Sequence, residues 1–279
     1  MIETSLLFAT VLAAGFGLLI GSFLNVVVYR VPNGMSVATP PSACPTCHSE
    51  IRSYDNVPVL SWLVLRGKCR DCRTPISARY PIVELLTGVF FLVVALQFWP
   101  RLTVPIEATR LVSDAIGLVA FLYLAAVSVA LAIIDAEHQR LPDRIVLPSY
   151  AVGFALLTTS SLLVGDWTSV VHSLIGGAAL FVFYFAVAFV HPAGMAFGDI
   201  KLAGVLGLYL GSLGWGPLLV GAFAAFLVGG LYSVALLATK RIGRKGGIPF
   251  GPWMLAGAWI GIFFGPSLWT GYLTLFGLA

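Results

Sequence analysis

Eight long apolar runs divide the 279-residue sequence and constrain its fold more strongly than any other feature. A helix needs about 20 mostly apolar residues to cross the hydrocarbon core of a bilayer. Hydrophobic residues make up 59% of the chain and charged residues only 10%, whereas a soluble domain has roughly 45–50% and about 25%. A soluble globular fold is therefore excluded. The sequence predicts an all-α polytopic membrane protein with about eight transmembrane helices, at about residues 6–29, 82–99, 111–134, 146–164, 170–190, 202–214, 216–239 and 249–276.

The basic residues indicate how these helices are oriented. If the N-terminus lies outside, the inner loops hold 14 of the 16 Lys and Arg residues. Cytoplasmic loops carry an excess of Lys and Arg, so we expect a multi-pass protein with its N-terminus outside and its longest loop in the cytoplasm. The expected inner loops are residues 30–81, 135–145, 191–201 and 240–248.

This topology divides the chain into three segments. Residues 1–29 form the first transmembrane helix, residues 30–81 a cytoplasmic loop domain, and residues 82–279 the transmembrane core. A loop of about 50 residues buries too little apolar surface to be stable without further help. We therefore expect a metal or a covalent crosslink within residues 30–81.

All four cysteines lie in this loop as two C-x-x-C pairs, Cys44 with Cys47 and Cys69 with Cys72, separated by 21 residues. The spacing is typical of a four-thiolate zinc site, which is structural because it leaves no position for a reactive water. Two disulfides are an alternative, but disulfides rarely persist in the reducing cytoplasm. His48 is a further candidate ligand. The positive-inside bias already explains the basic charge of the loop, so no nucleic-acid partner is expected.

Acidic residues at the ends of apolar runs are functional candidates, because ionisable groups at membrane depth are costly. Asp135 ends the third run and Asp199 precedes the sixth, so the topology puts both at cytoplasmic helix ends. Glu84, just inside the second run, is a third candidate. Two close carboxylates share one proton, so one can act as a base while the other polarises a carbonyl group.

Other interpretations of these acids remain open from the residues alone. Asp135 could be the interfacial end of a helix. Asp199 could pair with Lys201, although residues i and i+2 do not face each other on a helix. Both could instead line an ion pathway. Spacing cannot establish that two residues 64 positions apart meet.

Several motifs together resemble those of type IV prepilin peptidases, and the resemblance covers nearly the whole chain. Each motif alone would be weak evidence, but the combination is specific. Besides the cysteine pairs, the motifs are Gly21–Arg30 (GSFLNVVVYR), Ser61–Cys69 (SWLVLRGKC), Arg79–Glu84 (RYPIVE), Asp135 with Pro142-Asp143, and Phe197–Lys201 (FGDIK).

The resemblance implies an aspartyl protease of the GxGD type in the bacterial inner membrane, with Asp135 and Asp199 as the catalytic pair. Its substrates would be prepilins and pseudopilins, cut after the glycine that ends a short basic leader. The type IV pilus or type II secretion machinery is a candidate partner. One position departs from the family pattern, because the first motif glycine is replaced by Ala196.

The resemblance also implies an N-methyltransferase that modifies the new N-terminal amine with S-adenosyl-L-methionine. Family members with the long cysteine-containing loop are generally the methylating ones. Gly67 and Glu84 lie in the matching motifs and are candidate residues for binding the methyl donor. The alternatives are that Gly67 serves as a turn and that Glu84 pairs with Arg79.

Three alternative functions remain. The first is a prepilin peptidase that cleaves but does not methylate. The second is an ion-coupled transporter that uses the same intramembrane carboxylates, although a transporter would spread polar residues through several runs. The third is a zinc-loop scaffold without catalysis, which would leave the membrane carboxylates without a role.

Overall fold

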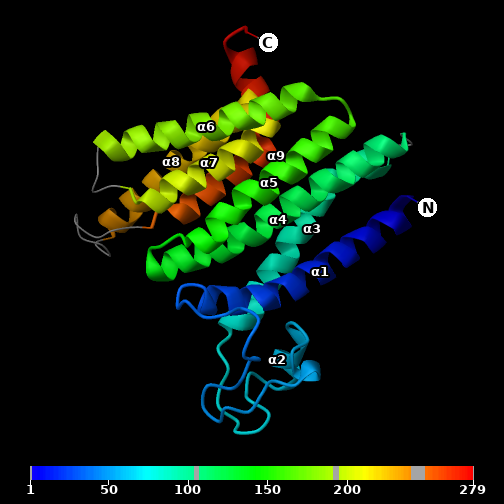
Figure 1. The fold of residues 1–279 in the computed structure, drawn as a ribbon, viewed down its shortest axis with the longest axis vertical. Helices are drawn as coiled ribbons and strands as arrows, with labels where there is room; N and C mark the ends of the chain where they lie inside the picture. Colours follow the sequence, from blue (N-terminus) through cyan, green and yellow to red (C-terminus); the bar gives the residue numbers. More distant parts are fainter. Residues whose placement is uncertain (1, 104–106, 191–194, 240–248, 279) are drawn as a thin grey trace. The chain divides into compact units, whose positions relative to one another are not determined.

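The computed structural model describes residues 2–103, 107–190, 195–239 and 249–278. Within them the chain is helical apart from connecting loops and two isolated β-bridges, which confirms the predicted all-α fold (Figure 1). The expected inner loop 240–248 and the first part of 191–201 lie outside the described residues. The helices are α1 (Ile2–Arg30), the 3-10 turn η1 (Ser53–Asp55), α2 (Leu60–Val64), α3 (Arg79–Thr103), α4 (Ala108–His138), α5 (Asp143–Leu163), α6 (Trp167–Val190), α7 (Phe197–Ser212), α8 (Trp215–Ala238) and α9 (Gly251–Leu275).

Within the described ranges, six helices are long and apolar enough to cross a membrane, namely α1, α3, α4, α5, α6 and α8. The other two expected spans correspond to α7 and α9. Helix α7 has 16 residues, about 24 Å at 1.5 Å per residue, whereas the hydrocarbon core is about 30 Å thick. Helix α9 has 25 residues with Pro266 inside it. The count of eight spans therefore stays a prediction.

The chain divides into two compact units, the first made of Met1–Pro105 and Phe121–Ala130 and the second of Ile106–Ala120 and Leu131–Ala279. In the first unit α1 and α3 lie side by side (Figure 1). A Cβ added at Gly17 would lie 2.8 Å from Gly88 Cα, and one at Gly21 would lie 2.7 Å from Glu84 Cα. Because these two pairs run in opposite chain directions, α1 and α3 are antiparallel, and the cysteine loop connects them as the turn of a hairpin.

The second unit contains two closely packed helix pairs, α6 with α7 and α8 with α9 (Figure 1). A Cβ added at Gly176 on α6 would lie 2.6 Å from Gly207 O on α7. A Cβ added at Gly261 on α9 would lie 2.6 Å from Pro217 O on α8. Small residues at such positions let helix backbones approach closely, a common way for membrane helices to associate.

Helix α7 is the central helix of the second unit. It contacts α5, α6, α8 and α9, and its residues from Leu202 to Gly211 are all buried. The Tyr150 hydroxyl of α5 donates a hydrogen bond of 2.6 Å to Lys201 O. This enclosure by neighbouring helices holds the first turn of α7, which carries Asp199, in a defined place.

Candidate functional site

Asp135 lies in the last turn of α4 and is buried, with 4% of its surface exposed. Its Oδ2 accepts a hydrogen bond of 3.0 Å from the backbone N–H of Gly251, the first residue of α9. A Cβ added at Gly251 would lie 2.6 Å from this oxygen. The carboxyl group of Asp135 therefore needs a glycine at the start of α9.

Asp199 lies in the first turn of α7 and is also buried, with 6% of its surface exposed. Its Oδ2 accepts a hydrogen bond of 3.0 Å from the backbone N–H of Ala196, the N-cap residue. Ala196 has φ −83° and ψ 154°, an extended conformation that any residue adopts. The alanine at this position therefore keeps the bond that orients Asp199, and it does so without backbone strain.

Leu141, in the loop between α4 and α5, connects the surroundings of the two aspartates. A Cβ added at Gly198 would lie 3.0 Å from Leu141 Cβ, and one at Gly251 would lie 3.4 Å from Leu141 Cδ2. In the part of the chain that the structure describes, each carboxylate accepts its hydrogen bond from a backbone N–H and not from the other.

An aromatic cluster borders the aspartates, and the sequence did not single it out. The ring of Tyr184 on α6, only 2% exposed, lies 5.4 Å from that of Phe226 on α8 and 6.3 Å from that of Phe250. Phe250 directly precedes Gly251, and Tyr184 lies within electrostatic range of Asp199. Aromatic residues are frequent throughout the chain, so nothing in the sequence pattern marked these three.

Lys201 pairs with Asp143 and not with Asp199. Its Nζ lies 2.7 Å and 2.9 Å from the two carboxylate oxygens of Asp143, the first residue of α5. The ammonium group also lies 4.9 Å from the ring centroid of Phe197. These contacts join the N-termini of α5 and α7 and leave the Asp199 carboxylate free of a cationic partner among the described residues.

The four cysteines of the loop form one cluster. Their sulfur atoms all lie within 4.8 Å of one another, with Cys44 Sγ 3.7 Å from Cys72 Sγ and Cys47 Sγ 4.0 Å from Cys69 Sγ. A tetrahedron with Zn–S bonds of about 2.3 Å has sulfur–sulfur edges of about 3.8 Å. All four thiols are free, and their arrangement therefore fits a zinc ion and not disulfides.

The two C-x-x-C segments have the same backbone geometry. In the first, Cys44 N–H donates to Ser49 O at 3.0 Å, and in the second Cys69 N–H donates to Thr74 O at 2.8 Å. The residue after each pair has a left-handed backbone, with φ 59° at His48 and φ 63° at Arg73. Each turn thus points two sulfurs at one place, while His48 acts as a turn residue outside the cluster.

The local hydrogen bonds also favour the thiolate form of Cys72, which is the form that binds a metal. Cys72 Sγ lies 3.2 Å from Thr74 Oγ1, and this contact is the main cause that lowers the pKa of the Cys72 thiol to about 6. A thiolate, not a thiol, binds zinc. The contact with Thr74 therefore favours the thiolate form of Cys72.

The structure gives the two candidate methyl-donor residues close packing partners. Gly67 has φ +66°, and a Cβ added there would lie 2.8 Å from the Trp62 ring. Glu84, 8% exposed, accepts a hydrogen bond of 2.7 Å at Oε2 from the backbone N–H of Val59. Both residues thus help to hold the loop between α1 and α3 in shape.

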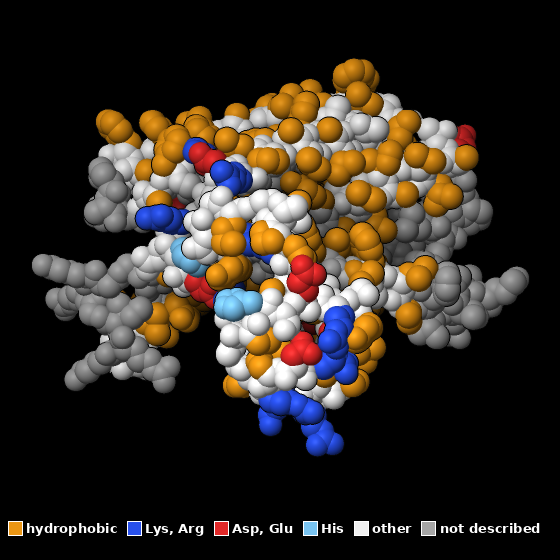
Figure 2. Space-filling view, turned by 60° about the horizontal axis from the view of Figure 1, so that its bottom comes forward, with side chains coloured by type: hydrophobic (Ala, Val, Ile, Leu, Met, Phe, Trp, Pro, Cys, Tyr) orange, Lys and Arg blue, Asp and Glu red, His pale blue; other side chains and the backbone are white. Residues whose placement is uncertain are grey.

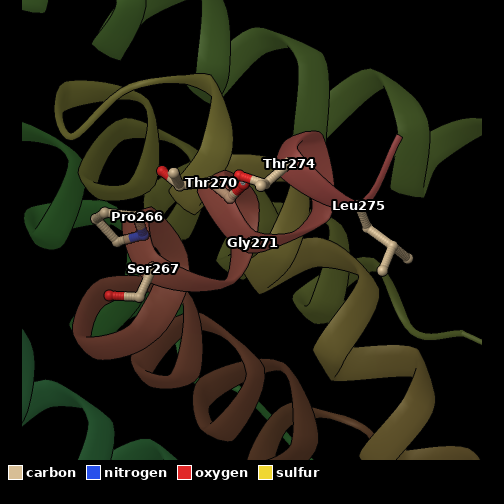
Figure 3. A pocket seen from close by; sticks show the side chains of 6 residues that line it. All are labelled: Pro266, Ser267, Thr270, Gly271, Thr274 and Leu275. Atoms are coloured by element: carbon tan, nitrogen blue, oxygen red, sulfur yellow. Dashed lines mark hydrogen bonds between the residues drawn. The ribbon is translucent and has the colours of Figure 1, made fainter. Parts of the chain in front are cut away.

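A shallow, open depression lies on the C-terminal half of α9 (Figure 3). Its lining comes from this one helix and includes the hydroxyls of Ser267, Thr270 and Thr274. Gly251, the partner of Asp135, begins the same helix. About 20 residues of helix, or roughly 30 Å, separate the two places. The depression is therefore not part of the aspartate site.

Comparison with known proteins finds related families in both the N-terminal and the C-terminal part of the chain. Residues 16–98 match the bacterial peptidase A24 N-terminal domain, and residues 121–234 match the type IV leader peptidase family. Proteins called prepilin leader peptidase/N-methyltransferase are similar over most of the chain. That of Aeromonas hydrophila is 35% identical, covering 94% of this chain and 92% of the relative. That of Neisseria gonorrhoeae is 34% identical, covering 94% and 93%. No solved structure matches.

Proposed function

Because this chain belongs to the type IV leader peptidase family, we propose that it removes the leader peptide of prepilins and then methylates the new N-terminal amine. Its relatives carry both activities in their names, and both family domains are present. The enzyme is a multi-pass membrane protein whose apolar helices fit a bacterial inner membrane. The excess of Lys and Arg in the expected inner loops supports an outside N-terminus and a cytoplasmic cysteine loop.

The observation that carries the peptidase mechanism is the burial of two carboxyl groups, those of Asp135 and Asp199, next to glycines that both approach Leu141. One aspartate, ionised, takes a proton from a water molecule, and the water oxygen then bonds to the scissile carbonyl carbon. The other aspartate, protonated, donates its proton to the carbonyl oxygen. When the tetrahedral intermediate collapses, the C–N bond breaks and the leaving amine takes a proton from the first aspartate. A hydroxyl group of the intermediate returns a proton to the second aspartate, which gives the carboxyl product and restores both aspartates to their starting states. No covalent intermediate with the enzyme forms.

The surroundings support this role for Asp135 and Asp199. Each carboxylate has one oxygen fixed by a backbone N–H, from Gly251 and Ala196 respectively, which leaves its other oxygen for water and substrate. Lys201 is occupied by Asp143, so its ammonium group does not compete for the shared proton. Such pre-organised placement of the reacting groups supplies a large part of enzymatic rate acceleration.

The cysteine cluster would hold a structural zinc ion through Cys44, Cys47, Cys69 and Cys72. The ion, when bound, crosslinks the two C-x-x-C turns of a loop that has little apolar core, and its binding energy becomes folding energy. The closed four-thiolate set gives it no position for substrate. Its contribution to catalysis is therefore to shape the loop domain.

S-adenosyl-L-methionine is the methyl donor that the N-methyltransferase activity requires. Gly67 and Glu84 stay candidate residues for binding it, and they also have packing partners, since the Trp62 ring lies beside Gly67 and the Val59 N–H donates to Glu84 Oε2. We therefore place these two residues in the methylation function as candidate donor contacts and as supports of the loop. Their substitution would change the loop that connects α1 and α3.

One assay tests both activities. Purified enzyme in detergent is incubated with a synthetic prepilin, with and without S-adenosyl-L-methionine, and the products are weighed by mass spectrometry. We expect cleavage after the leader glycine in both samples and an added methyl group only with the donor. Cleavage without methylation would leave a peptidase alone, and an uncut prepilin would contradict the proposal.

A further inference from the structure

The short helix α2 of the cysteine loop exposes an apolar face. Leu60 is 61% exposed, Leu63 57% and Val64 76%. Residues three and four apart lie on the same side of a helix, so these three side chains form one surface, which we call the α2 face. Trp62 points the other way, since its ring packs on Gly67 and its Nε1–H donates to Ile76 O at 3.1 Å.

The start of α2 is fixed at the level of a transmembrane helix. The backbone N–H of Val59, the N-cap of α2, donates to Oε2 of Glu84. Glu84 lies five residues into the membrane span that begins at Arg79, about 7.5 Å along the helix axis. Because the Glu84 side chain, on this span, binds the N-cap residue of α2, helix α2 cannot lie far out in the aqueous phase.

Helix α3 also exposes apolar side chains near Glu84. Around Glu84 the exposed α3 side chains are Ile82 at 53%, Leu85 at 53% and Leu86 at 58%, all within the same span. Basic residues follow α2 directly, with Arg66 and Lys68 both exposed. Figure 2, which turns the loop end forward, has hydrophobic and basic side chains next to one another on this part of the surface.

We propose that α2 lies in the membrane–water interface, with the α2 face among the lipid acyl chains and Arg66 and Lys68 at the lipid phosphates. A short apolar surface with basic neighbours is the pattern that binds anionic lipid surfaces. One side of the loop domain is then in contact with the bilayer. This contact holds the cysteine cluster against the membrane surface, which is where the new N-terminus of a membrane-anchored substrate emerges.

The depth of Val64 in the bilayer tests this proposal. A nitroxide-bearing amino acid is introduced at Val64 of the full-length enzyme by codon reassignment, so that the four cysteines stay unmodified. The enzyme is placed in nanodiscs containing phosphatidylglycerol. Accessibility to oxygen, which concentrates in lipid, is compared with accessibility to a water-soluble nickel chelate. The same label at Glu50, which is exposed elsewhere on the loop, is the control, and prepilin cleavage verifies the fold of both proteins.

We expect the Val64 label to be reached by oxygen and protected from the chelate, and the Glu50 label to show the reverse. Equal access of the chelate to both positions would overturn the proposal by placing α2 in water. Protection of Val64 from both reagents would also overturn it, because a protein surface would then cover the α2 face. Replacing Arg66 and Lys68 by Gln should make the Val64 label shallower in anionic nanodiscs but not in neutral ones. An unchanged depth would refute the role of these two residues.

Discussion

Asp135 and Gly251, 116 residues apart in the sequence, are joined by a hydrogen bond from the glycine N–H to the aspartate Oδ2. The bond connects the end of α4 to the start of α9, and the missing glycine side chain makes room for the carboxylate. The position of one carboxyl group therefore depends on a backbone position far along the chain.

Gly251→Ala should strongly impair cleavage. The new Cβ would lie 2.6 Å from Asp135 Oδ2, so the carboxylate must move, and a misplacement of about 1 Å can cost about 10²-fold in rate. Gly271→Ala on the same helix is the matched control, because a Cβ there would meet nothing within 4 Å. Prepilin cleavage by the purified variants measures the effect. Equal rates for the two variants would show that the Gly251 contact is unimportant.

Asp135→Asn and Asp199→Asn should each lower the cleavage rate by about 10²–10⁴-fold or more, the usual contribution of a general acid or base. Amides keep the shape but cannot exchange the proton. Asp114→Asn serves as the control, since Asp114 lies on α4 as Asp135 does but 21 residues away. Normal processing by either active-site variant, at wild-type expression, would refute the aspartate mechanism.

Cys72→Ser should abolish zinc binding, because three thiolates and a hydroxyl form a much weaker site. His48→Ala should keep a full complement of zinc, since His48 is a turn residue outside the sulfur cluster. Elemental analysis of the purified proteins gives the stoichiometry. Zinc retained by Cys72→Ser, or lost from His48→Ala, would point to a different ligand set.

Ala196→Gly should leave the cleavage rate unchanged. The N–H that orients Asp199 belongs to the backbone, and the extended conformation at Ala196 suits alanine and glycine alike. The added freedom of glycine in the unfolded chain should lower the stability by about 0.4–1 kcal/mol. Cleavage kinetics and thermal unfolding provide the measurement. A large gain in rate would mean that the alanine distorts the site.

The ion pair between Arg70 and Asp55 should stop stabilising the loop at acidic pH. Arg70 Nε donates to Asp55 Oδ2 at 2.7 Å, and this hydrogen bond lowers the pKa of Asp55. Its folded pKa is thus below its unfolded pKa of about 3.9, so the pair stabilises the loop above about pH 4 and less as the pH falls through the folded pKa.

Pepsin cleavage of the loop can follow this loss. At about pH 5, Asp55→Asn should be cut faster than the wild type, and the difference should shrink towards about pH 2.5. Arg52→Gln, which removes the more exposed pair with Asp71, is the control and should change little. A ratio of cleavage rates that stays constant with pH would exclude the Asp55–Arg70 pair as the cause.

Local patterns predicted much of this protein. The apolar runs predicted an all-α membrane fold, which is confirmed, and the C-x-x-C spacing predicted a cluster that the four sulfurs form. Both features depend on residues that are close in sequence. One tight turn positions the two sulfurs of each C-x-x-C pair, and one continuous apolar run forms each membrane helix. The two aspartates were chosen for their cost at membrane depth and for a family resemblance, and their catalytic role stays a prediction.

Contacts between distant segments could not be predicted. Nothing near Asp135 in the sequence points to Gly251, and nothing near Glu84 points to Val59. Leu141 and Tyr184 are ordinary apolar and aromatic residues in a chain that has many. Their importance arises from the packing of helices, which depends on glycine positions on both partners at once.

The burial of α7 also bears on the order in which the protein can assemble. A helix surrounded by α5, α6, α8 and α9 gains little from lipid and depends on its neighbours for a place in the bilayer. Asp199 is part of α7, and the N–H that binds Asp135 belongs to Gly251 at the start of α9. We therefore expect a nascent chain that has emerged only as far as α8 to hold both acids without the complete site.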